Sequence, residues 1–285
     1  MADKKGDAPS GPSAAKVKQA RTKSPHKQGR RTCFSILAML CWVLASVIAS
    51  QVAIGILLLL IVGEDRIEEP LWMAVYSALS YVVALALVIF VPPRISASWQ
   101  NRRNKKNHNS KTIEPRVASR EELGLKGWPT WTDIGLAPIG FIAQIILAGL
   151  LVAVFSLFPW FDAEQTQDVG FNVLNSGVDR ILAFISLAVV APIAEEIIFR
   201  GWLYGKLRRK LSGQVSEIAG IIISILLVSL LFGIVHMQWN VGVNVFAASV
   251  VLCGLREFTG TIYSGIIIHM LKNGVAFYLL YVAGI

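Results

Sequence analysis

The sequence predicts an all-α polytopic integral membrane protein, with about seven transmembrane helices around an intramembrane polar cavity. Of its 285 residues, 54% are hydrophobic and only 16% are charged, whereas charged residues make up about a quarter of a soluble domain. Seven apolar runs are long enough to cross a bilayer, and one of them carries two adjacent glutamates. These three observations exclude an ordinary soluble enzyme or binding module.

Each apolar run reaches or approaches the roughly 17–25 residues that a spanning helix needs. The first follows about thirty polar residues and exceeds the apolar core of a signal peptide, so it is expected to remain as a helix. The sixth is the shortest. No repeat joins the seven, which gives no support to an inverted-repeat transporter. In chain order the predicted spans are Phe34–Val62, Leu71–Val91, Ile134–Trp160, Ile181–Leu203, Ile218–His236, Val241–Leu255 and Ile262–Val282.

Lysine and arginine gather at alternate connections. Nine lie in residues 1–31 and nine in residues 94–131, and four more follow the fourth span at 206–210. The opposite connections are acidic, so the positive-inside rule predicts a cytoplasmic N-terminus. The predicted segments are a disordered basic cytoplasmic tail at 1–31, two transmembrane helices at 32–93, a basic cytoplasmic loop at 94–120 and a second membrane domain at 121–285.

The net charge of +9 is explained by this topology. The basic tail has no aromatic residues and is typical of a disordered segment near anionic lipid, not of a nucleic-acid-binding segment. The expected partners are therefore the lipid bilayer and a membrane-associated peptide or protein, with no nucleic acid. The short chain with its basic tail favours a multi-pass protein of the bacterial plasma membrane.

Two adjacent carboxylates, Glu195 and Glu196, lie in the middle of the fourth span. A charged side chain at that depth costs about 2.5–3.5 kcal/mol on insertion scales, so the pair requires a physical reason. Glu196 and Arg200 are four residues apart, which places them on one helix face where they can pair. Glu195 lies about 100° further round the helix and is left without that partner. Gly201 permits the close approach of a neighbouring segment.

Two further spans carry polar residues at helical spacing. Phe232 and His236 are four residues apart in the fifth span, and His269 and Asn273 are four apart in the last. One intramembrane histidine could simply bond a neighbouring helix. Two histidines, an amide and two carboxylates on three spans favour an assembled site.

This set of groups suits peptide hydrolysis. A desolvated glutamate can activate water, a histidine can share the proton, and a second histidine with an asparagine can stabilise an oxyanion. Glu195, His236 and His269 could also bind a divalent metal such as zinc, whose bound water would then be the nucleophile. The sequence contains no HExxH motif and leaves both versions open. Lys272, inside the last motif, must pair with a carboxylate or face water.

These residues form three ordered motifs: EExxxR at Glu195–Arg200, FxxxH at Phe232–His236 and HxxxN at His269–Asn273. In them the chain resembles the CPBP family of intramembrane proteases, which includes the type II CAAX prenyl endopeptidases and the Abi bacteriocin self-immunity proteins. The resemblance runs from about Glu121 to the C-terminus and includes the lead-in Arg120–Leu125.

The resemblance implies a CAAX-protease-type intramembrane endopeptidase, metallo- or glutamate-dependent. It assigns Glu195 to water activation with His236 beside it, and His269 with Asn273 to completing the site. Glu196, Arg200 and Phe232 would be supporting residues. We expect the catalytic side chains to share a cavity that opens toward the cytoplasm. The alternatives are a proton-coupled transporter that uses the same Glu/His cluster as a relay, or a noncatalytic membrane scaffold.

Overall fold

The computed structural model describes residues 25–108, 110–163, 171, 174 and 176–284, and these contain helices and no strand. The α-helices are α1 (Pro25–Val62), α2 (Glu64–Ile67), α3 (Pro70–Lys106), α4 (Trp131–Phe155), α5 (Gly177–Phe184), α6 (Ala191–Glu195), α7 (Gly205–Leu211), α8 (Glu217–Val235), α9 (Trp239–Thr259) and α10 (Tyr263–Tyr278). Three π-helical segments join or extend them: η1 (Ile185–Val190), η2 (Glu196–Tyr204) and η3 (Leu279–Ala283).

Seven helices within the described residues are long and apolar enough to span a membrane. The protein is therefore an all-α, multi-pass membrane protein, as predicted. The sixth span, the shortest in the sequence pattern, is a full helix, α9, that ends at Gly260 with a left-handed φ of 72°. Residues 1–24 of the predicted tail lie outside the described residues, and α1 begins within the remainder of that tail, at Pro25.

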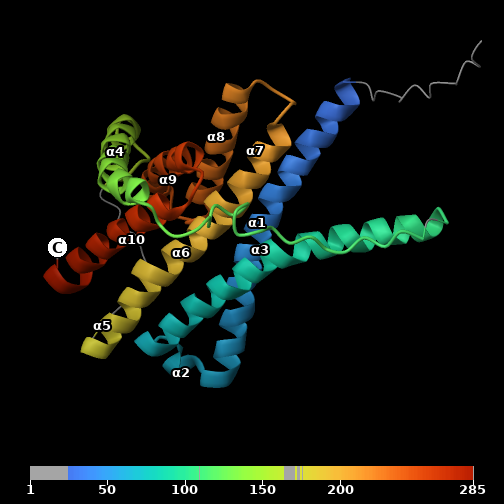
Figure 1. Ribbon diagram of the computed structural model, residues 1–285. Coiled ribbons are helices and arrows are strands. Elements are labelled where there is room, and N and C mark those ends of the chain that lie inside the picture. The colour runs from blue at the N-terminus through green and yellow to red at the C-terminus, as the bar shows by residue number, and fades with distance from the viewer. Residues whose placement is uncertain (1–24, 109, 164–170, 172–173, 175, 285) are drawn as a thin grey trace, which may run out of the picture.

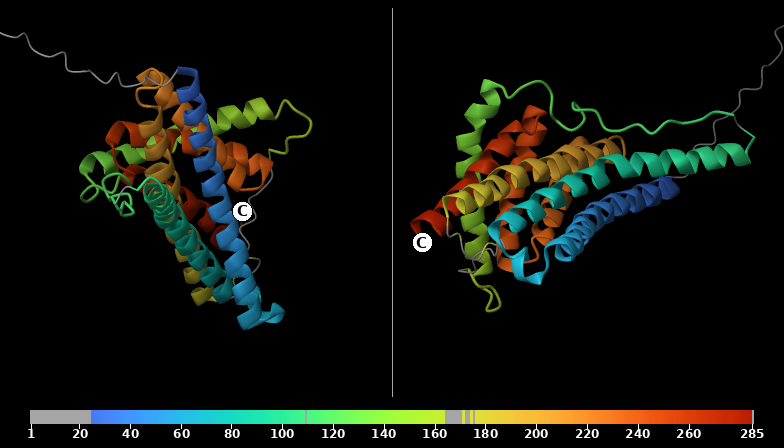
Figure 2. Two further views of the ribbon diagram at one scale, coloured as in Figure 1. Left: turned by 90° about the vertical axis from the view of Figure 1, so that its right-hand side faces the viewer. Right: turned by 90° about the horizontal axis from the view of Figure 1, so that it is seen from below.

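The fourth span is the central element of the bundle. Segments α5, η1, α6, η2 and α7 follow one another without a break and form one long helix in Figure 1. Figures 1 and 2 show α1 and α3 on one side of it and α4 and α10 on the other, which agrees with the packing of α3 and α10 against its segments. The glutamates of the fourth span are thus flanked by both halves of the chain.

The second span is longer than predicted. Its helix, α3, continues through Pro92 and Pro93 to Lys106, into the segment expected to be a basic loop. Both prolines remove a backbone donor from the helix interior and favour a bend, and Figure 1 shows α3 changing direction as it leaves the bundle. The polar composition after Val91 did not predict the end of the helix, which lies at Lys106.

The two N-terminal spans pack into the same core as the rest of the protein. Val43 of α1 and Val88 of α3 are fully buried in a cluster with Leu203 and Phe232 from the central helix and α8. The indole of Trp42 also donates to the carbonyl of Leu87 over 3.3 Å. Residues 32–93, which the sequence motifs do not reach, are therefore part of the framework that supports the site.

A tight turn at residues 119–125 holds the central helix against α10. The carbonyl of Leu123 lies so close to Gly201 that a β-carbon at Gly201 would stand 2.8 Å from it. Gly124 adopts a φ of 77°, and its carbonyl accepts from the N–H of Ile262 over 3.0 Å, just before α10 begins. The Ser119 N–H donates to Glu122 and lowers the pKa of that carboxyl. Gly201 does permit a close approach, but to this turn instead of to another helix.

Candidate functional site

The central helix changes its winding at the two glutamates. Glu195 is the last residue of α6, and Glu196 is the first residue of the π-helical segment η2. A π-helical turn adds a residue to the helix circumference, and such turns are frequent at functional sites. The change in winding directs the two adjacent carboxylates to different partners.

Glu196 holds a buried ion pair and a histidine. Its Oε1 accepts from Arg200 Nη1 over 2.8 Å, with both side chains fully buried. The same oxygen lies 3.1 Å from His269 Nδ1 on α10. With Nδ1–H as the donor, the imidazole is fixed by Glu196, and its Nε2 is left to face Glu195. The pairing of Glu196 with Arg200 predicted from their spacing is formed.

Glu195 is the carboxylate that faces the cavity. Its Oε1 accepts from the Tyr81 hydroxyl of α3 over 2.5 Å, and its Oε2 lies 3.6 Å from His269 Nε2. Its side chain remains 13% exposed, whereas that of Glu196 is fully buried. His269 therefore stands between two carboxylates, of which only Glu195 lines open space.

Phe232 separates the two histidines and positions both. Its ring centroid lies 4.8 Å from that of His236 and 5.9 Å from that of His269, both edge-on. The Arg200 guanidinium lies over the same ring at 4.2 Å. His236 Nδ1 bonds the Phe232 carbonyl over 2.7 Å, so its Nε2 is the nitrogen free for a substrate. The Phe232 ring therefore contacts residues of all three motifs.

Asn273 and Lys272 complete the polar part of the cavity. The Asn273 amide donates to the carbonyl of Leu187 in η1 over 2.9 Å, which leaves its second amide hydrogen for another acceptor. Lys272 lines the same cavity as Glu195 and is partly exposed there. Within the described residues its ammonium makes no ion pair within 4.0 Å. It therefore meets the expectation that a cation at this depth faces a water-accessible space.

The cavity has a volume of about 540 Å³ and is lined by Glu195, His236, His269, Lys272, Asn273 and Tyr81 among largely apolar residues. This size is within the range of about 300–1,000 Å³ of ligand pockets. The structure thus brings the predicted polar residues of three spans into one space.

The cavity is lined by residues of α1, of the first half of α3, of the central helix, of the α8–α9 region and of the second half of α10 with η3. The lining runs from Val47 in α1 to Tyr281 in η3, and no lining residue comes from the basic segments 94–131 or 206–210. Toward the basic end, Phe199 and Leu203 pack in the buried core. The opening of the cavity toward the cytoplasm stays a prediction.

The predicted metal ligands do not form a three-ligand site. Oε2 of Glu195 and Nε2 of His269 are 3.6 Å apart, the spacing of about 3–4 Å that two ligands of one zinc ion would show. Among the described residues, no group of three His, Cys, Asp or Glu side chains is placed to hold an ion.

Two residues of the site have no counterpart in the sequence motifs. Tyr81 lies in the second span, and the only signal for it is a tyrosine among serines near the middle of an apolar run. Gly265 lies one helical turn before His269, and a β-carbon there would stand 2.7 Å from Glu196 Oε2. Its role is steric and has no separate sequence signal.

The fold and the site together define a multi-pass membrane protein with a carboxylate–histidine cavity inside its helical bundle. Residues 177–275 match the family model described as type II CAAX prenyl endopeptidase Rce1-like, and this range contains all three motifs. Over these residues the chain is similar to the type II CAAX prenyl endopeptidases, and this match supports the resemblance to the CPBP intramembrane proteases that the three motifs indicate. No curated protein and no solved structure matches the chain.

Proposed function

We propose that the protein is a glutamate-dependent intramembrane endopeptidase. It cleaves a membrane-associated protein or peptide, and its Glu195 acts as the base. The observation that carries this proposal is that Glu195 lines the cavity, whereas Glu196 is fully buried. Glu196 is committed to Arg200 and His269, whereas Glu195 faces the cavity and contacts Tyr81 and His269 there. A carboxylate kept open to a substrate-sized space is suited to act as a base.

In the proposed reaction the Glu195 carboxylate removes a proton from a water molecule as the water oxygen bonds to the scissile carbonyl carbon. The C–N bond then breaks, and the proton passes to the leaving amine, which yields a carboxylic acid and an amine. Tyr81 orients one oxygen of Glu195 through its hydroxyl, and His269 lies against the other. Glu196 and Arg200 act through His269 by fixing its ring, so they are positioning residues.

The developing oxyanion requires a donor or a cation on the other side of the substrate carbonyl. Two groups that line the cavity can supply it: the free amide hydrogen of Asn273 and the ammonium of Lys272. The proposed reaction assigns the donor role to Asn273, with Lys272 adding positive charge to the same space. Because His236 donates through Nδ1 to the Phe232 carbonyl, its Nε2 is an acceptor that can hold the attacking water.

We further propose that the N-terminus is cytoplasmic, on the basis of the basic connections. The cavity is predicted to open toward the same side. Substrates would then be membrane-associated proteins or peptides whose scissile bond reaches that side.

The test first captures substrate proteins with an inactive variant and then measures cleavage of a peptide taken from one of them. The full-length Glu195→Gln variant, expressed in native membranes, should retain bound substrate proteins that can be identified by mass spectrometry. Purified wild-type protein in lipid nanodiscs should cleave a peptide taken from such a substrate, and Glu195→Gln should show no turnover while inserting normally. Glu217→Gln, the same change at an exposed position at the start of α8, is the matched control and should cleave at the wild-type rate. Turnover by Glu195→Gln near the wild-type rate would exclude this residue as the base.

A further inference from the structure

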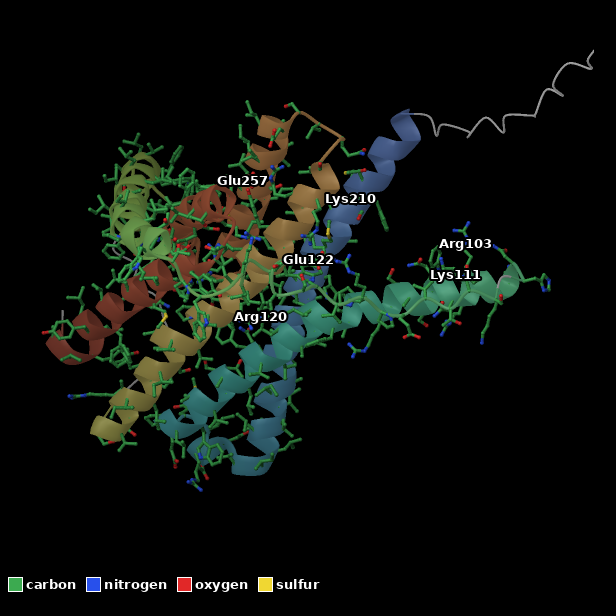
Figure 3. All side chains as sticks on the ribbon, in the orientation of Figure 1. Arg103, Lys111, Arg120, Glu122, Lys210 and Glu257 are labelled. Atoms are coloured by element: carbon green, nitrogen blue, oxygen red, sulfur yellow. The ribbon has the colours of Figure 1, made fainter. Side chains whose placement is uncertain are left out.

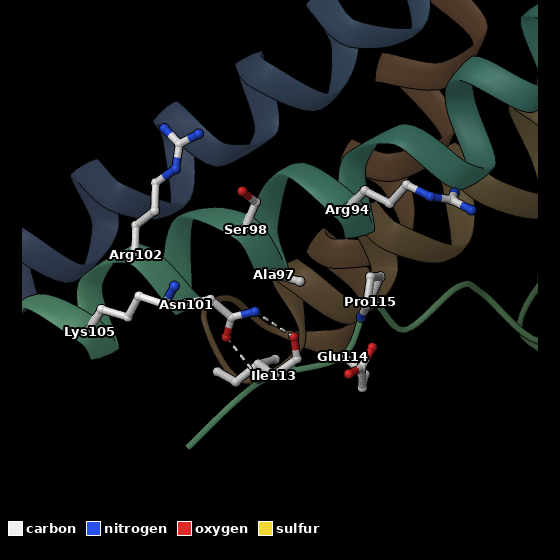
Figure 4. Close-up of a pocket in the computed structure, with 9 residues that line it drawn as sticks. All are labelled: Arg94, Ala97, Ser98, Asn101, Arg102, Lys105, Ile113, Glu114 and Pro115. Carbon is white, nitrogen blue, oxygen red and sulfur yellow. Dashed lines mark hydrogen bonds between the residues drawn. The ribbon is translucent and has the colours of Figure 1, made fainter. Parts of the chain in front are cut away.

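A second groove lies outside the bundle, on the part of α3 beyond its prolines. It has a volume of about 430 Å³ and is formed between the helix and residues 113–115, which run back along it. Figure 4 shows Arg94, Arg102 and Lys105 projecting from the helix around this groove, with Glu114 on the returning segment. None of these residues belongs to the catalytic cavity.

The groove is held in shape by asparagine side chains. Asn101 bonds both backbone groups of Ile113, accepting from its N–H over 2.8 Å and donating to its carbonyl over 2.9 Å. One turn later, Asn104 donates to the carbonyl of Lys111 over 2.7 Å. Ala97, only 4% exposed, leaves room for the returning segment to lie against the helix. The groove is thus a built feature of the fold.

The groove has an excess of positive charge. It is lined by three cations and one carboxylate. Arg94 uses one N–H to bond the Phe90 carbonyl over 2.9 Å, whereas Arg102 and Lys105 make no side-chain hydrogen bond or ion pair within the part of the chain that the structure describes. Two unpaired cations beside a groove suit an anionic ligand with several acceptor oxygens.

The surroundings of the groove are typical of a membrane surface. Ile95 and Trp99 lie four residues apart on α3 and are 56% and 64% exposed, and tryptophan is enriched where lipid headgroups meet water. Arg103 lies over the Trp99 ring at 5.9 Å. Figure 3 shows Arg103 on the extension of α3 and Lys111 on the segment that runs back along it, both away from the rest of the bundle. Exposed apolar and basic residues on one helix are expected to lie in the interfacial layer.

We propose that the groove between α3 and residues 113–115 binds the headgroup of an anionic phospholipid in the adjacent leaflet. The phosphate would lie between Arg102 and Lys105, while Ile95 and Trp99 enter the layer below it. The net positive lining favours an anionic headgroup over a zwitterionic one. Binding there would fix α3 at the membrane surface, and α3 is the helix that carries Tyr81 into the catalytic cavity.

The experiment measures lipid retention, so it does not depend on proteolysis. Full-length protein is reconstituted with equal amounts of phosphatidylglycerol, phosphatidylethanolamine and phosphatidylcholine, released into detergent, and its bound lipids are identified by native mass spectrometry. Wild-type protein should be enriched in phosphatidylglycerol. Arg102→Gln with Lys105→Gln should reduce this enrichment about ten- to thirtyfold.

The matched control is Arg103→Gln with Lys106→Gln, which removes the same charge from the same turns but from residues that do not line the groove. It should change the enrichment less than threefold. An equal loss in both double variants, or no phosphatidylglycerol enrichment in wild type, would overturn the proposal. Displacement of the bound lipid by millimolar glycerol 3-phosphate would assign the groove to a soluble anion and also overturn it.

Discussion

The hydroxyl of Tyr81 donates to Oε1 of Glu195 over 2.5 Å and so links the second span to the carboxylate of the fourth. A hydrogen bond to a charged group contributes about 1.5–3 kcal/mol, which corresponds to roughly ten- to hundredfold in rate if it orients the base. Tyr81→Phe should therefore lower kcat by about that factor, as measured by peptide cleavage in nanodiscs.

The control for this change is Tyr263→Phe, which removes a hydroxyl that donates to the Gly127 carbonyl over 2.7 Å, away from the cavity. It should keep kcat within twofold of wild type. Equal activity of Tyr81→Phe and Tyr263→Phe would show that Tyr81 does not orient Glu195.

The buried pair Glu196–Arg200 should behave as a coupled unit. Arg200→Ala leaves the Glu196 carboxylate buried without its cation, at a cost of about 3–5 kcal/mol. Adding Glu196→Ala should recover part of this stability, although activity stays lost because His269 is no longer fixed. Thermal unfolding of the single and double variants in detergent measures the coupling.

The partly exposed pair Arg208–Glu257, at 2.8 Å, provides the comparison. Exposed pairs typically contribute about 0–1 kcal/mol, so Arg208→Ala should lower the stability much less than Arg200→Ala. Strict additivity of the Glu196 and Arg200 changes would refute their pairing.

Gly265 should be essential because of the space it leaves for Glu196. In Gly265→Ala the new β-carbon would meet Glu196 Oε2 at 2.7 Å, so the carboxylate must move from His269. We expect a stability loss of about 1–3 kcal/mol together with a large loss of cleavage. Gly274→Ala on the same helix meets only a Phe184 ring carbon at 3.7 Å and should fold as well as wild type. Both are checked by unfolding and cleavage assays, and full activity of Gly265→Ala would contradict the observed contact.

Activity should not depend on a bound metal. Since no three potential ligands converge among the described residues, dialysis against a chelator should leave cleavage within twofold of the untreated rate. Elemental analysis of the purified protein serves as the second readout. Stoichiometric zinc that is lost in both His236→Ala and His269→Ala would instead support the metal-bound version.

The sequence predicted the bundle and the glutamate, the two histidines, the lysine and the asparagine that line the cavity, because both leave local signals. Apolar runs of spanning length identify the helices, and an ionisable residue inside such a run is costly enough to indicate a site. The spacing of Glu196 and Arg200 likewise predicted their ion pair. The length of α3 was missed because a helix can continue into water after its apolar residues end.

By itself the sequence determined that this is a membrane protein, which helices carry its polar groups, and which protease family its second half resembles. Only the tertiary structure decided which of those groups contact one another and which line the cavity. Tyr81 reaches Glu195 only because α3 packs beside the central helix, and Gly265 matters only because α10 lies against Glu196. Contacts between residues far apart in the chain depend on how whole helices pack against one another. The spacing of residues within one helix contains no information about that packing.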